Sequence, residues 1–272
     1  MPRTTLTERQ QRELDYYSEF SKRYPISKVN FAPVEGKEQR PWNSYWFVYQ
    51  TVAEFFEGDH QRLLDFGCGR GTASMRFAKL GYETHGFDLC PDNLENCELL
   101  AEKYGYSSRC HFSIQLAEQL TYGDSMFDVV CGIDILHHIE IAPAIREVRR
   151  ILKPGGLAVF REFVEVPIFD RVRNSRLVRK YFSKDMSIDE HRTHDERKLD
   201  KRDLRDIRDV FPALEVKRFC LISRLHRIVK KRRPGASRLE RIDHALVRAI
   251  PFLSSLGGEA VLICRKEGVE QS

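Results

Sequence analysis

Two carboxylates and a group of closely spaced glycines could together bind a nucleoside. Asp65 directly precedes a loop with glycine at positions 67, 69 and 71, and Asp88 follows about 20 residues later. Glycines at alternate positions allow a tight turn and let a ligand approach the backbone without meeting a β-carbon. A carboxylate at the end of the next strand can accept hydrogen bonds from both hydroxyls of a ribose. The spacing therefore predicts a nucleoside site.

A dinucleotide is the main alternative ligand for such a loop, and the spacing argues against it. Dinucleotide loops prefer the pattern G-x-G-x-x-G/A. Here the third position is Thr72 when counted from Gly67, and Ser74 when counted from Gly69. Asp65 would also repel a pyrophosphate, whereas it would attract a ligand with positive charge. The remaining alternative is a glycine-rich turn that binds nothing.

These residues must be positioned by alternating strands and helices. The predicted strands cover residues 62–66, 82–88, 110–114, 127–132 and 157–163, and the predicted helices cover 72–80, 92–104 and 141–152. Further strand character occurs at 214–222 and 259–265. Such alternation requires right-handed crossovers, which place the strands in a parallel sheet with helices on both faces. We therefore predict an α/β fold.

Composition divides the chain into two parts with two insertions. Residues 1–60 are polar and aromatic with helical spacing, and we predict that they form a helical N-terminal cap. Residues 61–272 hold the alternating pattern and form the second unit. We expect a charged helical insertion at about 164–212 and a basic insertion at about 223–258.

The motifs resemble, in the expected order, those of the class I S-adenosylmethionine-dependent methyltransferases. The matching strings are the first motif at 63–71, the ribose motif at 86–89, the adenine-side segment at 117–120, the fourth strand at 127–130, and the later motifs at 135–139 and 149–156. The resemblance covers about residues 62–163. It implies a Rossmann-like, mostly parallel seven-stranded sheet with its last strand antiparallel.

The resemblance also implies which residues bind the cofactor, S-adenosyl-L-methionine. They are Asp65, Gly67, Cys68, Gly69, Gly71, Asp88, Leu89, Ala117, Glu118, Ile133 and His138. One position departs from the pattern, because many relatives place an aspartate just before the Ala-Glu pair to bind the adenine amino group. Leu116 stands there in this chain, so the amino group needs Glu118 or another partner.

Two residues are candidates for a catalytic role. His137 follows the fourth predicted strand at the ligand edge of the sheet, where it could serve as a base for a hydroxyl or amine acceptor. The alternative is a histidine packed at the start of a helix. Glu162 ends the fifth predicted strand and could meet an acceptor, or it could pair with Arg161.

The sequence predicts neither a metal site nor export. Seven cysteines are scattered without CxxC spacing, and the chain starts without the apolar core of a signal peptide. His191 and His194 lie in a uniformly charged stretch that is more typical of a solvated segment. No apolar run approaches the roughly 20 residues of a membrane helix. We therefore expect reduced thiols and a cytoplasmic location. Peripheral contact with a membrane is compatible with this location.

The positive charge of the chain is concentrated in the late basic segment. Residues 221–256 contain nine Lys and Arg against two acidic residues, which gives +7, while the whole chain carries +5. This segment could be a solvated lid over an acceptor pocket, or it could contact an anionic membrane that carries a lipid-tailed acceptor. Nucleic acid is the least favoured partner, because no RNA-binding module accompanies the cluster.

These features together predict a methyltransferase for a small-molecule acceptor. Oxygen is the favoured acceptor atom, and the acceptor could have a hydrophobic or lipid tail. An RNA or protein methyltransferase is an alternative, although Asn-Pro-Pro-Tyr-type loops are absent after the fourth strand, where Gly132, Ile133 and Asp134 stand. A regulatory protein that binds the cofactor without catalysis is the alternative from another class.

Overall fold

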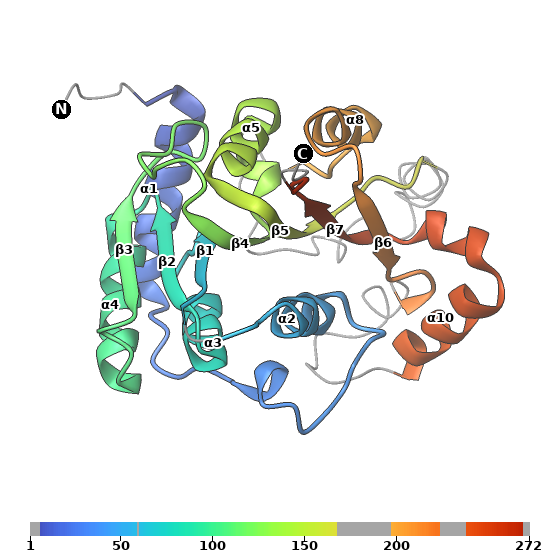
Figure 1. Cartoon of the computed structure of the whole chain (residues 1–272), viewed down its shortest axis with the longest axis horizontal. Helices are drawn as coiled ribbons and strands as arrows, with labels where there is room; N and C mark the ends of the chain where they lie inside the picture. Colours follow the sequence, from blue (N-terminus) through green and yellow to red (C-terminus); the bar gives the residue numbers. More distant parts are fainter. Residues whose placement is uncertain (1–5, 59, 168–196, 224–237, 269–272) are drawn as a thin grey trace, which may run out of the picture.

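Seven strands of the described chain form one sheet in the order β3-β2-β1-β4-β5-β7-β6 (Figure 1). The computed structural model describes residues 6–58, 60–167, 197–223 and 238–268. The strands are β1 (Arg62–Phe66), β2 (Glu83–Asp88), β3 (Cys110–Ile114), β4 (Phe127–Ile133), β5 (Leu152–Phe163), β6 (Glu215–Phe219) and β7 (Glu259–Arg265).

Strand direction follows the predicted pattern. The first five strands pair in parallel, and β7 is antiparallel to both β5 and β6. The central strand β1 is a short apolar run, in which Leu63, Leu64 and Phe66 are fully buried because helices cover both faces of the sheet. The strand order reverses between β1 and β4. The Rossmann-like fold predicted from the sequence is thus confirmed, including the antiparallel last strand.

Helices pack on both faces of the sheet (Figure 1). They are α1 (Glu8–Arg23), α2 (Ser44–Glu54), α3 (Thr72–Leu80), α4 (Pro91–Tyr104), α5 (Ile141–Ile151), α8 (Lys201–Val210) and α10 (Arg238–Ala249), with 3₁₀ turns η1 (Ala32–Val34), η2 (Leu136–His138) and η4 (Pro251–Leu256). One apolar core joins the sheet to α5 and α8, and another joins it to α2 and α3. Local signals set several ends: Gly81 and Gly105 end α3 and α4 in left-handed conformations.

Two parts of the chain differ from the sequence expectation. Strand β5 starts at Leu152 rather than at 157, because Leu152 pairs with Phe127 and the backbone N–H of Gly155 donates to Lys266 in the extension of β7. The two helices of the N-terminal 60 residues also pack in different places. Helix α2 packs on the sheet as part of the apolar core and reaches the cavity through Tyr45, whereas α1 lines the cavity along one face.

Parts of both predicted insertions fall outside the described residues. These parts include His191, His194 and the basic run at 230–233. The described portions are α8, which begins with a capping box between Asp200 and Asp203, and the pair formed by α10 and η4. Among the described residues, none of the helices combines the length and the hydrophobicity that crossing a bilayer requires.

Candidate active site

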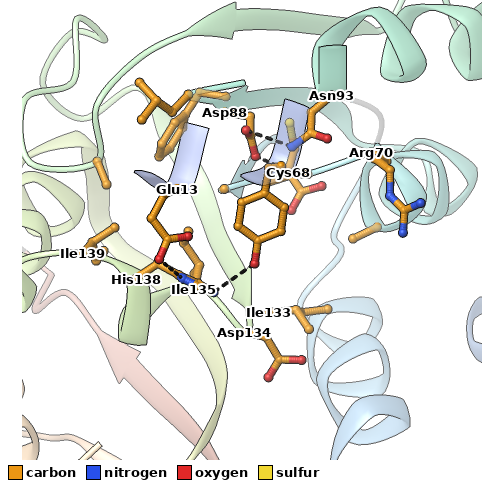
Figure 2. Close-up of a pocket in the computed structure, with 18 of the residues that line it drawn as sticks. Glu13, Cys68, Arg70, Asp88, Asn93, Ile133, Asp134, Ile135, His138 and Ile139 are labelled. Carbon is orange, nitrogen blue, oxygen red and sulfur yellow. Dashed lines mark hydrogen bonds and ion pairs between the residues drawn. The ribbon is translucent and has the colours of Figure 1, made fainter. Parts of the chain in front are cut away.

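A cavity of about 350 Å³ lies where β1, β2 and β4 end, with α1 along its side. This is the point at which the strand order reverses and where open α/β sheets bind their ligands. All the predicted cofactor-binding residues except Gly71 line this cavity. Figure 2 shows Asp88 and Asn93 on one side of it and Glu13, Ile135 and His138 on another.

The glycine loop fits closely against its neighbours. Gly67 has a φ of 70°, and a β-carbon on it would lie 2.5 Å from Cδ1 of Ile135, so only glycine fits there. Gly69 faces open space and donates its backbone N–H to Asp88 at 3.0 Å. Gly71 does not reach the cavity. A β-carbon there would lie 2.8 Å from the sulfur of Cys97, so Gly71 allows packing between α3 and α4 rather than cofactor contact.

Asp65 is a buried carboxylate in the wall of the cavity. It is 2% exposed, and the hydroxyl of Ser74 on α3 donates to it at 2.5 Å. Burial raises the pKa of Asp65 to about 7, although the hydrogen bond from Ser74 opposes the shift. The side chain can therefore change its charge near neutral pH, and a bound cation would favour the ionised form.

Asp88 is oriented by three donors from the surrounding loops. One carboxylate oxygen accepts the backbone N–H of Cys90 at 2.8 Å and the side-chain amide of Asn93 at 3.0 Å, and the other accepts the N–H of Gly69. Burial raises the pKa of Asp88, whereas these donors lower it. The sequence did not single out Asn93, which holds the predicted ribose ligand in place from the first turn of α4.

The predicted adenine side of the cavity contains mainly apolar groups. Leu89, Leu116 and Ala117 line it together with Glu118. One oxygen of Glu118 accepts the backbone N–H of Glu140 at 3.0 Å, so this carboxylate is already tied to the start of α5. The structure therefore keeps Glu118 at the cavity without showing a dedicated partner for an amino group.

His137 and Glu162 interact with each other and do not line the cavity. Glu162 is fully buried, and its carboxylate accepts the backbone N–H groups of Ile135 and Leu136 at 2.8 and 2.6 Å. Its other oxygen lies 2.7 Å from Nδ1 of His137, which is 7% exposed. Glu162 therefore holds the loop after β4, and the catalytic role of either side chain stays a prediction. Arg161, the predicted partner of Glu162, pairs instead with Asp134 and Glu259.

One face of α1 supplies part of the cavity wall. Gln10, Glu13, Tyr17 and Phe20 line it at the 3–4–3 spacing of a helix face. Nδ1 of His138 lies 3.1 Å from Glu13, and its Nε2 lies 3.3 Å from the hydroxyl of Tyr17, so the predicted cofactor residue His138 also fastens α1 to the site (Figure 2). The sequence predicted a helical cap in this part of the chain, but not which residues of the helix line the cavity.

Asp134 is a further ionisable group of the cavity that the sequence analysis did not select. Its backbone has a φ of 58°, which non-glycine residues seldom adopt, and its side chain points towards Arg161, with which it forms an ion pair. Burial raises the pKa of Asp134, while Arg161 lowers it. Its position two residues after the end of the predicted fourth strand was the signal that could have identified it.

The central part of the chain matches a known family. A family profile described as a methyltransferase domain matches residues 64–160, which include the glycine loop, Asp88 and β4. Residues 64–160 form a class I methyltransferase domain. The chain is 34% identical over 139 residues to a ubiquinone biosynthesis O-methyltransferase of Cereibacter sphaeroides, and 32% identical over 142 residues to the 27-O-demethylrifamycin SV methyltransferase of Amycolatopsis mediterranei.

These alignments cover only part of each protein. They include 47% and 49% of this chain, and 54% and 51% of the relatives, so the chain spans about half the length of the curated relatives it matches.

Solved structures resemble the methyltransferase domain and its surroundings in fold. Geranyl diphosphate C-methyltransferase from Streptomyces coelicolor has a TM-score of 0.59 at 16% identity, with 98% of this chain and 100% of that chain covered. The cyclase SpnF has a TM-score of 0.58 at 22% identity, with 96% and 98% covered. At these identities the likeness shows a shared fold, and the reaction must be argued from the site.

Proposed function

We propose that this protein transfers the methyl group of S-adenosyl-L-methionine to a small-molecule acceptor, with oxygen as the favoured acceptor atom. The observation that carries the proposal is the arrangement of Asp65, the glycine loop and Asp88 around one cavity. Of the two relatives named above, one is a ubiquinone biosynthesis O-methyltransferase and the other is a methyltransferase of 27-O-demethylrifamycin SV. These names favour a small acceptor over RNA or protein.

The residues of the cavity fit the proposed cofactor. Gly69 leaves room for a ligand beside the backbone, Gly67 allows the close approach of Ile135, and the carboxylate of Asp65 suits a cationic methionine portion. Asp88 is preoriented by Gly69, Cys90 and Asn93 and can accept hydrogen bonds from ribose hydroxyls. S-adenosyl-L-methionine supplies a methyl group that is already activated by a positively charged sulfur.

The protein would contribute mainly position and exclusion of water. Orientation of reacting groups can be worth about 7–11 kcal/mol of a barrier. Helix α1 covers the cavity through Tyr17 and Phe20, and Glu162 fixes the loop that carries His138. If the acceptor hydroxyl must lose a proton, we propose Asp134 as the receiving group, because it lines the cavity and His137 does not. His137 and Glu162 then act as positioning residues.

Transfer of label from methyl-labelled S-adenosyl-L-methionine tests this function. We expect labelled product when the protein is incubated with a small-metabolite or lipid extract, and none with RNA or with proteins. Label in RNA or protein would favour the corresponding alternative. Cofactor binding without label in any fraction would favour a regulatory protein that does not catalyse transfer.

We expect the affinity for S-adenosyl-L-methionine to rise about tenfold between pH 6 and pH 8. With a pKa of about 7, Asp65 is mostly protonated at pH 6 and mostly ionised at pH 8, and the cationic ligand favours the ionised form. The stability of the free protein should change with pH in the opposite direction to the cofactor affinity. A raised carboxyl pKa makes the free energy of unfolding fall as pH rises from about 4 to about 7. Calorimetry at both pH values measures the effect, and Asp65→Asn should remove it. A pH dependence retained by Asp65→Asn would contradict the assignment.

We also propose that α10 and η4 contact an anionic membrane surface. Ile242, Ile250 and Phe252 are 47%, 40% and 72% exposed, an unusual concentration of apolar groups for one short segment. The acid Asp243 is 4% exposed and accepts backbone N–H groups of residues 221–223, so it contributes little charge outside. Arginines therefore dominate the charge of this segment, which suits anionic headgroups.

Liposome flotation tests this contact. We expect the protein to float with vesicles that contain phosphatidylserine and to remain behind with vesicles of phosphatidylcholine alone. Phe252→Asp should reduce flotation several-fold because it removes the most exposed apolar group and adds repulsion. Leu99→Asp is the matched control, since Leu99 is 60% exposed on α4. Equal flotation with both vesicle types would exclude the proposed contact. We also propose that the chain divides into two parts. Residues 1–60 contain α1, which forms the cap, and residues 61–272 contain the methyltransferase domain with the two insertions.

A further inference from the structure

Three side chains that commonly bind metal ions converge at the start of β2 and β3. They are Glu83 and His85 on β2 and His111 on β3. Glu83 and His85 are two residues apart on a strand, so they share one face of the sheet. His85 and His111 are directly paired in the parallel β2–β3 ladder, which places His111 on the same face.

The spacing of the three side chains is close to that of a metal site. Oε1 of Glu83 lies 3.3 Å from Nε2 of His85 and 3.6 Å from Nε2 of His111, and the three ligand atoms all lie within 4.8 Å of one another. In a tetrahedral zinc site with bonds of 2.0–2.1 Å, neighbouring ligand atoms are about 3.3 Å apart. His111 is 47% exposed in its side chain, so its ring can adjust by a small rotation.

Neighbouring groups hold two of the ligands in place. The ring of His85 packs edge-on against Phe127 and Tyr122, with centroid distances of 5.3 and 6.1 Å. Nε of Arg62 donates to Oε2 of Glu83 at 3.2 Å, which leaves Oε1 directed at the two imidazoles. Such outer contacts fix the orientation of metal ligands. Within the described residues, no other side chain hydrogen-bonds to either imidazole.

We propose that Glu83, His85 and His111 bind a divalent transition-metal ion such as Zn²⁺. Two imidazole nitrogens and one carboxylate oxygen suit this class of ion, and the exposure of His111 leaves a fourth position open to water. The site departs from the expectation of no metal. It had no recognisable motif, because His111 follows His85 by 26 positions and only strand pairing brings them together.

The role of this site is structural rather than catalytic. Glu83 begins β2 and Asp88 ends it, so the two lie about 17 Å apart at opposite ends of the strand. Strand β3 is at the edge of the sheet and pairs only with β2 among the described strands. A shared ion would join this edge strand to the strand that carries Asp88, and it would stabilise the folded protein.

Zinc titration of the full chain with reduced cysteines tests the proposal. Calorimetry should show saturable binding of one Zn²⁺ that His111→Ala weakens at least tenfold. His111 is exposed, so this variant is expected to fold normally. The control is His244→Ala. His244 lies on α10, at the end of the sheet opposite to β3 (Figure 1).

Thermal unfolding gives a second readout that does not depend on methyl transfer. Saturating Zn²⁺ should raise Tm by about 5 °C in the wild type and in His244→Ala, and much less in His111→Ala. Zinc bound by cysteines instead of by the proposed site would still bind to His111→Ala, so this variant distinguishes the two. Equal zinc affinity in His111→Ala and the wild type, or no saturable binding below about 1 mM, would overturn the proposal.

Discussion

Asp88→Ala is expected to weaken the binding of S-adenosyl-L-methionine at least 100-fold. The proposed role of Asp88 is to accept hydrogen bonds from two ribose hydroxyls, and each hydrogen bond to a charged group is worth about 1.5–3 kcal/mol. The variant also removes the acceptor of the Gly69 N–H, which shapes the glycine loop. Both losses act on the same ligand, so the effect on binding should be among the largest of any single substitution.

Calorimetry on purified variants measures this effect, with thermal unfolding to confirm that each variant is folded. Asp88→Asn retains one acceptor oxygen and should fall between the wild type and Asp88→Ala. The matched control is Asp124→Ala, because the side chain of Asp124 is 77% exposed and lies outside the cavity. Unchanged affinity in a folded Asp88→Ala protein would refute the ribose assignment.

Glu162→Ala is expected to lower the free energy of unfolding by about 3–5 kcal/mol. The substitution leaves three buried or partly buried donors without this acceptor, namely the backbone N–H groups of Ile135 and Leu136 and the ring of His137. Each buried unsatisfied group costs about 1–3 kcal/mol. Because the same loop carries His138 into the cavity, methyl transfer should fall together with stability.

Two further variants separate the structural role of Glu162 from a chemical one. Glu162→Gln keeps an acceptor for the backbone and has an amide that can donate to His137, so it should cost about 1 kcal/mol. Glu165→Ala, which removes an exposed carboxylate three residues away, should change stability by less than about 0.5 kcal/mol. A folded Glu162→Gln variant with wild-type stability but an altered pH profile of kcat would contradict a purely positioning role.

Several features of the site depend on local sequence and could be predicted. The glycine loop, Asp65 and Asp88 lie at strand ends that apolar runs define, and strand ends in a parallel sheet meet at one edge. Helices α3 and α5 were predicted to within a residue, because their apolar spacing and their glycine or proline ends act over only a few positions.

Other features depend on which elements pack together. Gly71 belongs to the predicted loop, yet it faces Cys97 because α4 crosses it. The sequence left open whether Glu162 meets an acceptor or pairs with an arginine, and the structure shows that the loop after β4 donates two backbone N–H groups to its carboxylate. Strand β5 also extends further than its apolar run, since Leu152 pairs with Phe127 and residues 155–156 exchange backbone hydrogen bonds with Lys266.

The sequence by itself determined the order of strands and helices, the glycine loop and the two carboxylates that favour a cationic nucleoside. Periodicity and turn residues encode these features within a few positions of each other. The tertiary structure alone decided which face of α1 lies along the cavity, that His137 pairs with Glu162 away from it, and that His111 joins Glu83 and His85. Those contacts join residues far apart in the chain, so they arise only when packing and strand register bring the elements together.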